Sequence, residues 1–276
     1  MRSARLPVLT AAKMAAAERR WLRRHPGQDA RLMARAAEAI AKASLRLLAG
    51  VRPGRVTAVA GKGRNGADAI LAALRLAPGR RVTVVLAEDS VSAGLPRRAL
   101  ERARRAGARI LDWPAAQARR PEADLVLDGL LGSGFRPPLS PRLRDAVRWI
   151  GGYRDPIVAV DLPSGAGDDT DGPCVRADLT VSIGCLKSPL LRPRVAARRQ
   201  DSTFISAAPG IAGEPATIST RPCRRFSVRA RRGAARASNA DSVAAVVVPV
   251  GRSSPRSTTR ILPARAAIRG RSRGDF

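Results

Sequence analysis

The chain has 276 residues, of which 45% are hydrophobic. This length and composition exclude a wholly disordered chain and predict a globular protein with one large core or two small ones. No apolar run reaches the roughly 18 to 20 residues that a membrane helix needs. Lys13 interrupts the apolar N-terminal segment too early for a signal peptide. We therefore expect a cytoplasmic protein that does not contact a membrane.

The formal net charge is +29, which in general favours binding to nucleic acid or to an anionic membrane. Only four of the 51 basic residues are lysine, and such an arginine excess is typical of coding bias in a GC-rich genome. Aromatic residues make up 3% of the chain, too few for the stacking platforms of single-strand binding proteins. The composition thus disfavours nucleic acid as a partner. The three cysteines form no CxxC pair, so neither a disulfide framework nor a zinc site is predicted.

Predicted helices and strands alternate along most of the chain. Residues 9–49 carry Leu, Met and Ala at helical spacing among charges, which predicts amphipathic helices. Short β-branched, apolar runs predict strands at 55–60, 81–87, 108–111, 124–128, 156–160, 178–183 and 202–206. Helices are predicted between them at 68–76, 96–106 and 141–150. Apolar strands separated by helices form a mostly parallel sheet covered on both faces, so we expect a three-layer α/β/α, Rossmann-like domain over residues 1–212.

Residues 213–276 differ from the rest in composition. They contain 14 arginines, no lysine and three acidic residues, and only the run 243–250 is strongly apolar. Little core can form from such a segment, so we expect a basic low-complexity tail that is disordered. A basic arm that binds a partner and a frame-shifted remnant of a second domain are alternative interpretations.

A glycine-rich turn follows the first predicted strand of the βαβ unit. Gly61, Gly63 and Gly66 match the GxGxxG pattern, in which backbone N–H groups and a helix N-terminus favour a phosphate. Glu88 and Asp89 lie about 20 residues further on, where a Rossmann dehydrogenase places its ribose-binding acid. An NAD(P)-dependent oxidoreductase is therefore one interpretation. A tight turn that needs glycine for structural reasons alone is the other.

Three other predicted strands also run directly into polar or small residues. These segments are Asp128 with the following GLLGSGF, Asp161-Leu-Pro-Ser-Gly165, and Thr180 to Lys187. Because the carboxyl ends of parallel strands converge on one crevice, one ligand could be reached by Asn65, Asp68, Asp128, Asp161 and Ser164. Oxygen donors of this kind also suit a hard cation. Any one of these acids could instead cap the next helix.

Taken in order, these motifs resemble a known family. GKGRNGAD at 61–68 is similar to the GPGNNGGD of the NAD(P)H-hydrate epimerases, and DGLLGSG, AVDLPSG and ADLTVSIGCLK follow as in that family. The family's domain is also called the YjeF N-terminal domain, and it forms the first half of bifunctional NAD(P)H-hydrate repair enzymes. The resemblance covers about residues 8 to 212 and implies the same α/β fold.

The resemblance implies an isomerase that interconverts the R and S forms of NADH and NADPH hydrated at C6 of the nicotinamide ring. It implies potassium as the cofactor, one ion per subunit, with Asn65, Asp128 and Ser164 as its ligands. The positions that it assigns to the dinucleotide substrate are Arg64, Asn65, Gly66, Ala67, Asp68, Gly132, Ser133, Gly134, Phe135, Arg136, Pro137, Pro138 and Asp161. Asp161 is the expected catalytic acid and base, and Lys187 is a second candidate.

The sequence also departs from the family pattern. Lys62, Arg64 and Ala67 replace the usual Pro, Asn and Gly, and the added methyl of Ala67 would matter if that position needs positive φ. The family's ADP- or ATP-dependent dehydratase half needs roughly 250 to 280 residues. Only 64 follow residue 212, so we expect the dehydratase to be a separate partner. A homodimer is possible, and a non-catalytic module of the same fold whose arginines engage RNA is a further alternative.

Overall fold

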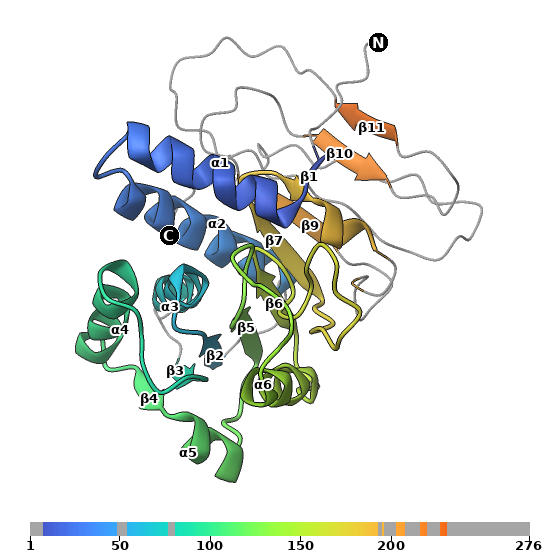
Figure 1. Ribbon diagram of the computed structural model, residues 1–276. Coiled ribbons are helices and arrows are strands. Elements are labelled where there is room, and N and C mark those ends of the chain that lie inside the picture. The colour runs from blue at the N-terminus through green and yellow to red at the C-terminus, as the bar shows by residue number, and fades with distance from the viewer. Residues whose placement is uncertain are drawn as a thin grey trace, which may run out of the picture.

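A computed structural model describes residues 8–48, 54–76, 81–192 and 195, together with the backbone of three later strands. Its centre is a seven-stranded sheet with the order β4-β3-β2-β5-β6-β7-β9, in which every neighbouring pair is parallel (Figure 1). The strands are β2 (Arg55–Ala60), β3 (Arg81–Leu86), β4 (Arg109–Leu111), β5 (Leu125–Gly129), β6 (Ile157–Val160), β7 (Leu179–Ile183) and β9 (Thr203–Ala207).

Helices cover both faces of this sheet. On one face lie α2 (Asp29–Leu47), α3 (Arg64–Leu76) and α4 (Leu95–Arg105), and on the other lie α5 (Trp113–Ala118) and α6 (Pro141–Gly151). Successive residues of a strand point to opposite faces, and in β2 the side chain of Ala58 packs with α2 and α3 while that of Val59 packs with α5 and α6. The predicted three-layer α/β/α architecture is confirmed.

The strand order reverses beside β2. From β2 the chain adds β3 and then β4 on one side, and it returns to place β5, β6, β7 and β9 on the other side. In open parallel sheets, ligands bind outside the carboxyl ends of the strands at such a reversal. A ligand is therefore expected at the carboxyl ends of β2 and β5.

The N-terminal elements are held beside this edge by strand pairing and hydrogen bonds. Strand β1 (Val8–Leu9) pairs in parallel with β8 (Leu186–Lys187), and α1 (Ala11–Arg24) follows it directly. The carboxylate of Asp168 accepts hydrogen bonds from the N–H groups of Ala11 (2.8 Å) and Ala12 (3.0 Å), and the hydroxyl of Ser188, in the 3-10 helix η1 (Ser188–Leu191), donates to it over 3.1 Å. Asp168 thus joins the start of α1 to the segment after β8.

The structure corrects the start of one predicted helix. We expected a glycine-rich turn up to residue 67, but α3 already begins at Arg64, and the N–H of Ala67 donates to the carbonyl of Gly63 over 3.2 Å. The turn is therefore only three residues long. Helix α5 and strands β1 and β8 were not predicted at all.

The basic tail falls mostly outside the described residues, including the apolar run 243–250. Two short strands were not expected there, β10 (Ala216–Ser219) and β11 (Ser227–Ala230), and they pair antiparallel. The boundary at residue 212 stays a prediction.

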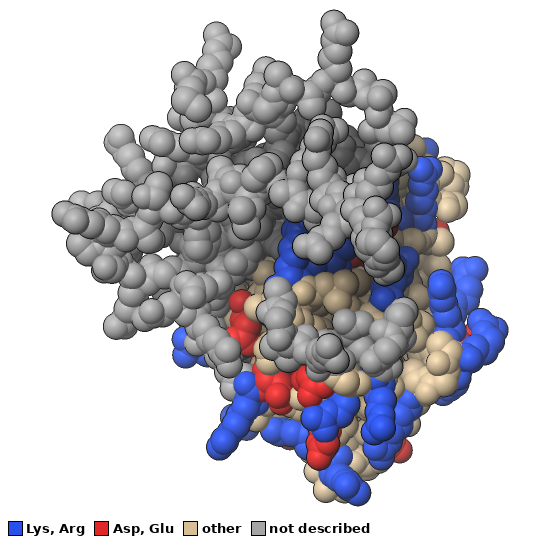
Figure 2. All heavy atoms as spheres, turned by 180° about the vertical axis from the view of Figure 1, so that it is seen from behind, with Lys and Arg blue, Asp and Glu red and all other residues tan. Residues whose placement is uncertain are grey.

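On the face seen in Figure 2, Lys and Arg side chains lie along much of the described rim, several of them side by side, and Asp and Glu side chains lie between them. No described helix is long and apolar enough to cross a membrane.

Candidate functional site

The glycine-rich turn packs tightly against the segment that follows β5. A Cβ at Gly61 would collide with the carbonyl oxygen of Leu130, and one at Gly66 would collide with the carbonyl oxygen of Gly61. A Cβ at Gly63 would meet nothing within 4 Å. The first and third glycines are therefore required for the close approach of two backbones, whereas none of the three has a positive φ, so the turn does not need glycine for its backbone angles.

Two side chains on the first turns of α3 each have a buried polar atom without a partner among the described residues. Asn65 lies against Gly132, where an added Cβ would be 2.8 Å from the amide Oδ1. Asp68 is 9% exposed. Within the described part of the chain, Asn65 Nδ2 and Asp68 Oδ1 are buried and have no hydrogen-bond partner. Burial raises the pKa of Asp68 well above its usual value, against the opposing effect of Arg64.

Asp128 and Ser164 form a buried pair at the ends of β5 and β6. The Ser164 hydroxyl donates to Asp128 Oδ1 over 2.5 Å, and the Ser164 N–H donates to Oδ2 over 2.8 Å. Ser164 Oγ also accepts from the N–H of Leu131 (2.8 Å). Burial raises the pKa of Asp128 to about 6, although the hydrogen bonds from Ser164 lower it. No described lysine or arginine forms an ion pair with this carboxylate.

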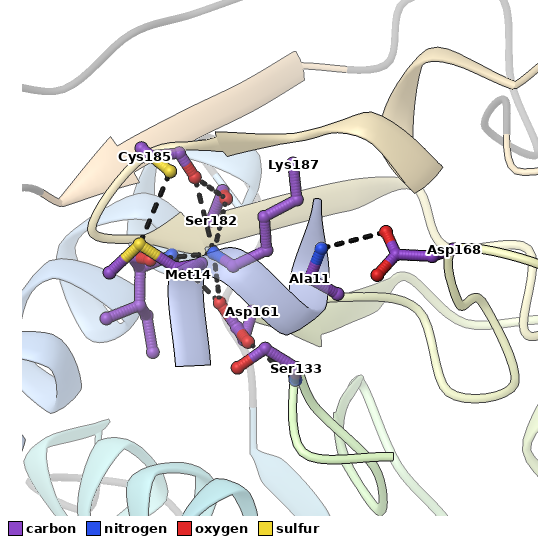
Figure 3. A network of polar contacts seen from close by, with 9 residues as sticks. Ala11, Met14, Ser133, Asp161, Asp168, Ser182, Cys185 and Lys187 are labelled. Carbon is purple, nitrogen blue, oxygen red and sulfur yellow. Dashed lines mark hydrogen bonds and ion pairs between the residues drawn. The ribbon is translucent and has the colours of Figure 1, made fainter. Parts of the chain in front are cut away.

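Asp161 follows β6 directly and is held on both carboxylate oxygens. Oδ2 accepts from the N–H of Ser133 over 2.9 Å, and Oδ1 accepts from the N–H of Ile183 over 3.2 Å. Lys187 Nζ lies 2.6 Å from Oδ1 (Figure 3). Asp161 has a φ of 69°, and a non-glycine residue in this conformation costs about 1–3 kcal/mol, which persists only where the surroundings fix it. Such strain is common at functional sites.

The ammonium of Lys187 is enclosed. Its side chain is 0% exposed, and besides Asp161 it donates to the Ile183 carbonyl (2.7 Å), the Ser182 hydroxyl (3.1 Å) and the Cys185 carbonyl (3.2 Å). Four oxygens surround three N–H donors, so no donor is left for a ligand. Lys187 was the second catalytic candidate, and its geometry fits the positioning of Asp161 better than contact with a substrate.

The loop after β5 carries most of the other predicted substrate positions. Ser133 meets Asp161 through its N–H, and Phe135 is half-buried against the core around α6. Gly134, Arg136, Pro137 and Pro138 are exposed.

The three residues that depart from the family pattern differ in their surroundings. Ala67 lies inside α3, is 1% exposed and packs in the core, so its position does not need positive φ. Arg64 is exposed and lies 3.4 Å from Glu18 of α1. The Lys62 ammonium pairs with Glu88 at 3.2 Å, and its N–H donates to the same carboxylate over 3.0 Å.

The two acids considered for a ribose are engaged by protein groups. Glu88 closes the glycine turn through Lys62. Asp89 lies 2.7 Å from the guanidinium of Arg142. Both carboxylate oxygens of Glu88 are thus engaged by Lys62, whereas the Asp89 side chain is 85% exposed and pairs through Oδ2.

Sequence reasoning missed two residues that build this site. Ser182 helps to hold Lys187, and Asp168 fastens α1 beside it. Asp168 is separated from Ala11 by 157 positions, and no local pattern signals such a contact. The strand-end position of Ser182 is the one signal that the sequence offers.

Comparison with known proteins adds the family. The model of the "YjeF-related protein N-terminus" matches residues 29–188, a span that contains every predicted site residue. The chain belongs to this family. An NAD(P)H-hydrate epimerase of Microbacterium testaceum is 40% identical over 174 residues, covering 59% of this chain and 64% of that protein. A bifunctional NAD(P)H-hydrate repair enzyme Nnr of Mycobacterium leprae is 40% identical over 168 residues, covering 58% of this chain and 34% of that enzyme.

The chain thus spans less than two thirds of the curated YjeF-related relatives named above. Among solved structures, yeast ynu0 (YNL200c) has a TM-score of 0.63 at 22% identity, covering 75% of this chain and 91% of that one. This likeness supports the fold of the domain. No dehydratase domain is matched in this chain.

Proposed function

We propose that this protein is an NAD(P)H-hydrate epimerase, which interconverts the R and S forms of hydrated NADH and NADPH. The relatives that bear this name are the first support. The observation that carries the proposal is the arrangement of Asp161. Its carboxylate is fixed at the carboxyl end of β6, beside the reversal of the strand order, where it accepts from the N–H of Ser133 in the loop after β5 and pairs with Lys187.

The dinucleotide would lie across the ends of β2, β5 and β6. The N-terminus of α3 supplies the partial positive charge that suits a pyrophosphate, and Arg64 adds a full charge beside it. The unpartnered Asn65 and Asp68 atoms offer hydrogen bonds to the same ligand. We assign to the substrate the residues Arg64, Asn65, Gly66, Ala67, Asp68, Gly132, Ser133, Gly134, Phe135, Arg136, Pro137, Pro138 and Asp161.

The residues around Asp128 fit a potassium ion. A fully buried carboxylate without a basic partner is costly, and its raised pKa reports this cost. Amide, carboxylate and hydroxyl oxygens are the donors that a hard cation takes. Asn65, Asp128 and Ser164 would hold the ion, which would supply the missing positive charge beneath the substrate.

Asp161 is the group that we assign to the chemistry. In the hydrate, the C6 hydroxyl sits on a carbon bonded to the ring nitrogen, so it can depart and return with proton transfer to and from a carboxyl group. Ser133, Ile183 and Lys187 fix the carboxylate of Asp161 in one orientation. Lys187 therefore acts on the substrate through Asp161.

The test is direct. Purified S and R hydrates of NADH are incubated with the full chain, and the two forms are followed by chiral chromatography against the spontaneous rate. We expect rapid interconversion without redox turnover of the cofactor. A rate equal to the spontaneous one would reject the proposal. A separate ADP- or ATP-dependent dehydratase, added to the mixture, should then consume both forms.

A further inference from the structure

The crevice holds two buried carboxyl groups in opposite environments. Asp161 receives two backbone N–H groups and the ammonium of Lys187. Asp68 is buried to the same degree, yet its Oδ1 has no partner in the described part of the chain. Burial without a hydrogen-bond partner favours the neutral acid over the anion, so Asp68 is the group suited to give a proton.

Asp161 and the helix that carries Asp68 both meet the same short segment of the loop after β5. Asn65 and Asp68 are three residues apart on α3 and so share one face of the helix, and the side chain of Asn65 lies against Gly132. Asp161 accepts a hydrogen bond from the N–H of the next residue, Ser133. Helix α3 follows β2 and Asp161 follows β6, with β5 between them, and the carboxylate of Asp161 is near enough to Asp68 to raise the pKa of Asp68.

In an epimerisation at C6 the hydroxyl leaves from one face of the ring and returns on the other, so a proton donor on the first face and a proton acceptor on the second would assist it. We propose that Asp68 is a second catalytic residue, which gives a proton to the departing C6 hydroxyl while Asp161 takes a proton from the water that adds to the opposite face. This inference rests on the proposed epimerase function and assigns a partner to Asp161 in it.

The step balances without an oxidant or a reductant. The C6–O bond breaks with its electron pair on oxygen, which takes the Asp68 proton and leaves as water. The lone pair of the ring nitrogen forms the N1=C6 double bond. Water then adds to the other face, the π pair returns to nitrogen, and the proton of the added water passes to Asp161. The proton lost by Asp68 and the one gained by Asp161 exchange with solvent between turnovers.

The charges around Asp68 agree with this role. Burial is the main cause of its raised pKa, and the carboxylates of Asp161 and of Glu18 on α1 raise it further. Arg64, on the same helix, is the charged neighbour that lowers it. Asp68 therefore retains its proton at a pH where an exposed aspartate is ionised. The reaction should slow as the pH rises through this raised value.

The experiment uses the full chain with an Asp68→Asn substitution, which keeps the shape and removes the transferable proton. Exposed Asp145 of α6, which pairs with Arg148 at 3.7 Å, provides the matched control Asp145→Asn. We expect Asp68→Asn to lower kcat by about 100-fold or more with a change in KM of only a few-fold. It should also abolish the decline of kcat at alkaline pH. Asp145→Asn should behave as the wild type.

Three results would overturn the assignment. An unchanged kcat, a loss confined to KM, or an alkaline decline that persists in Asp68→Asn would each show that Asp68 does not donate the proton. Circular dichroism and thermal unfolding check that the variant folds. We expect Asp68→Asn to lower neither the helical signal nor the melting temperature. If the wild type itself does not interconvert the hydrates, the proposed function fails and this inference fails with it. If the wild type and Asp68→Asn are equally active, the epimerase function stands and Asp68 is excluded as a catalytic residue.

Discussion

Asp128 lies in the last residues of β5 and Asp161 follows the neighbouring strand β6; both are buried, but within the described residues a cation pairs only with Asp161. Asp161 has Lys187 at 2.6 Å, whereas the described partners of the Asp128 carboxylate are Ser164 and the N–H of Leu130. A buried charge is stable only when it is paired or neutralised. The charge of Asp161 is therefore neutralised by a residue of the chain itself. The charge of Asp128 has to be neutralised by an added proton or cation.

Under the proposed function, this contrast separates two tasks at the carboxyl ends of neighbouring strands. A carboxylate that must exchange protons with a substrate has to keep a fixed position, and the lysine provides it. A carboxylate that holds an ion must be left without a basic residue of its own. Substitutions at the two sites should therefore change different properties of the protein.

The largest effect is expected at Asp161. Asp161→Asn keeps the size of the side chain but cannot take up the proton, so the epimerisation rate should fall by about 1,000-fold. Chiral chromatography of the hydrates measures this rate, and the secondary structure should remain intact. Wild-type turnover in this variant would remove Asp161 from the mechanism.

A substitution of Lys187 tests how much its ion pair with Asp161 contributes to the stability of the protein. Lys187→Met leaves a buried carboxylate without its partner, so the free energy of unfolding should fall by about 3–5 kcal/mol. Denaturant unfolding measures this change. Lys42 supplies the control, because its pair with Glu38 at 2.5 Å is on the surface, and Lys42→Met should cost only about 0.5 kcal/mol. Equal losses in the two variants would contradict the importance of burial.

The sequence predicted the sheet well, for a local reason. The run RVTAVA at 55–60 is apolar and β-branched between breakers, and β2 spans those same residues. Because parallel strands bring their carboxyl ends together, the convergence of Asn65, Asp161 and Ser164 near one loop also followed from the strand assignments.

What the sequence did not predict depends on tertiary contacts. RNG at 64–66 is a poor start for a helix by propensity, yet α3 begins there because Gly66 must pack against the carbonyl of Gly61. Helix α5 has six residues, too few for a hydrophobic period, and β1 and β8 have two each. The pairing of Lys187 with Asp161 joins residues 26 apart, and nothing local reveals it.

Potassium should act on the Asp128 site in a pH-dependent way. The pKa of Asp128 is raised to about 6, so without potassium the folded state loses stability as the pH rises from about 4 to above 6, by up to about 3 kcal/mol. A bound cation offsets this loss. We expect potassium chloride to raise the melting temperature at pH 8, and to do so much less at pH 5, relative to a large organic cation at equal ionic strength.

The same measurement on a variant assigns the effect to one residue. Asp128→Asn removes the charge that attracts the ion, so its melting temperature should respond equally to potassium and to the organic cation. A wild-type response in this variant would exclude Asp128 as a ligand.

The smallest effect is expected at Arg64, the exposed counterpart of the two buried sites. Its pair with Glu18 is 3.4 Å long and lies in solvent, where such pairs contribute about 0–1 kcal/mol. Arg64→Asn, which restores the residue usual in the family, should therefore leave the unfolding free energy nearly unchanged. If Arg64 attracts the pyrophosphate, KM should rise by about 2- to 5-fold, and salt should reduce this difference because exposed charges are screened. A large fall in kcat would instead place Arg64 at the reacting ring, on the same side of the crevice as Asp68.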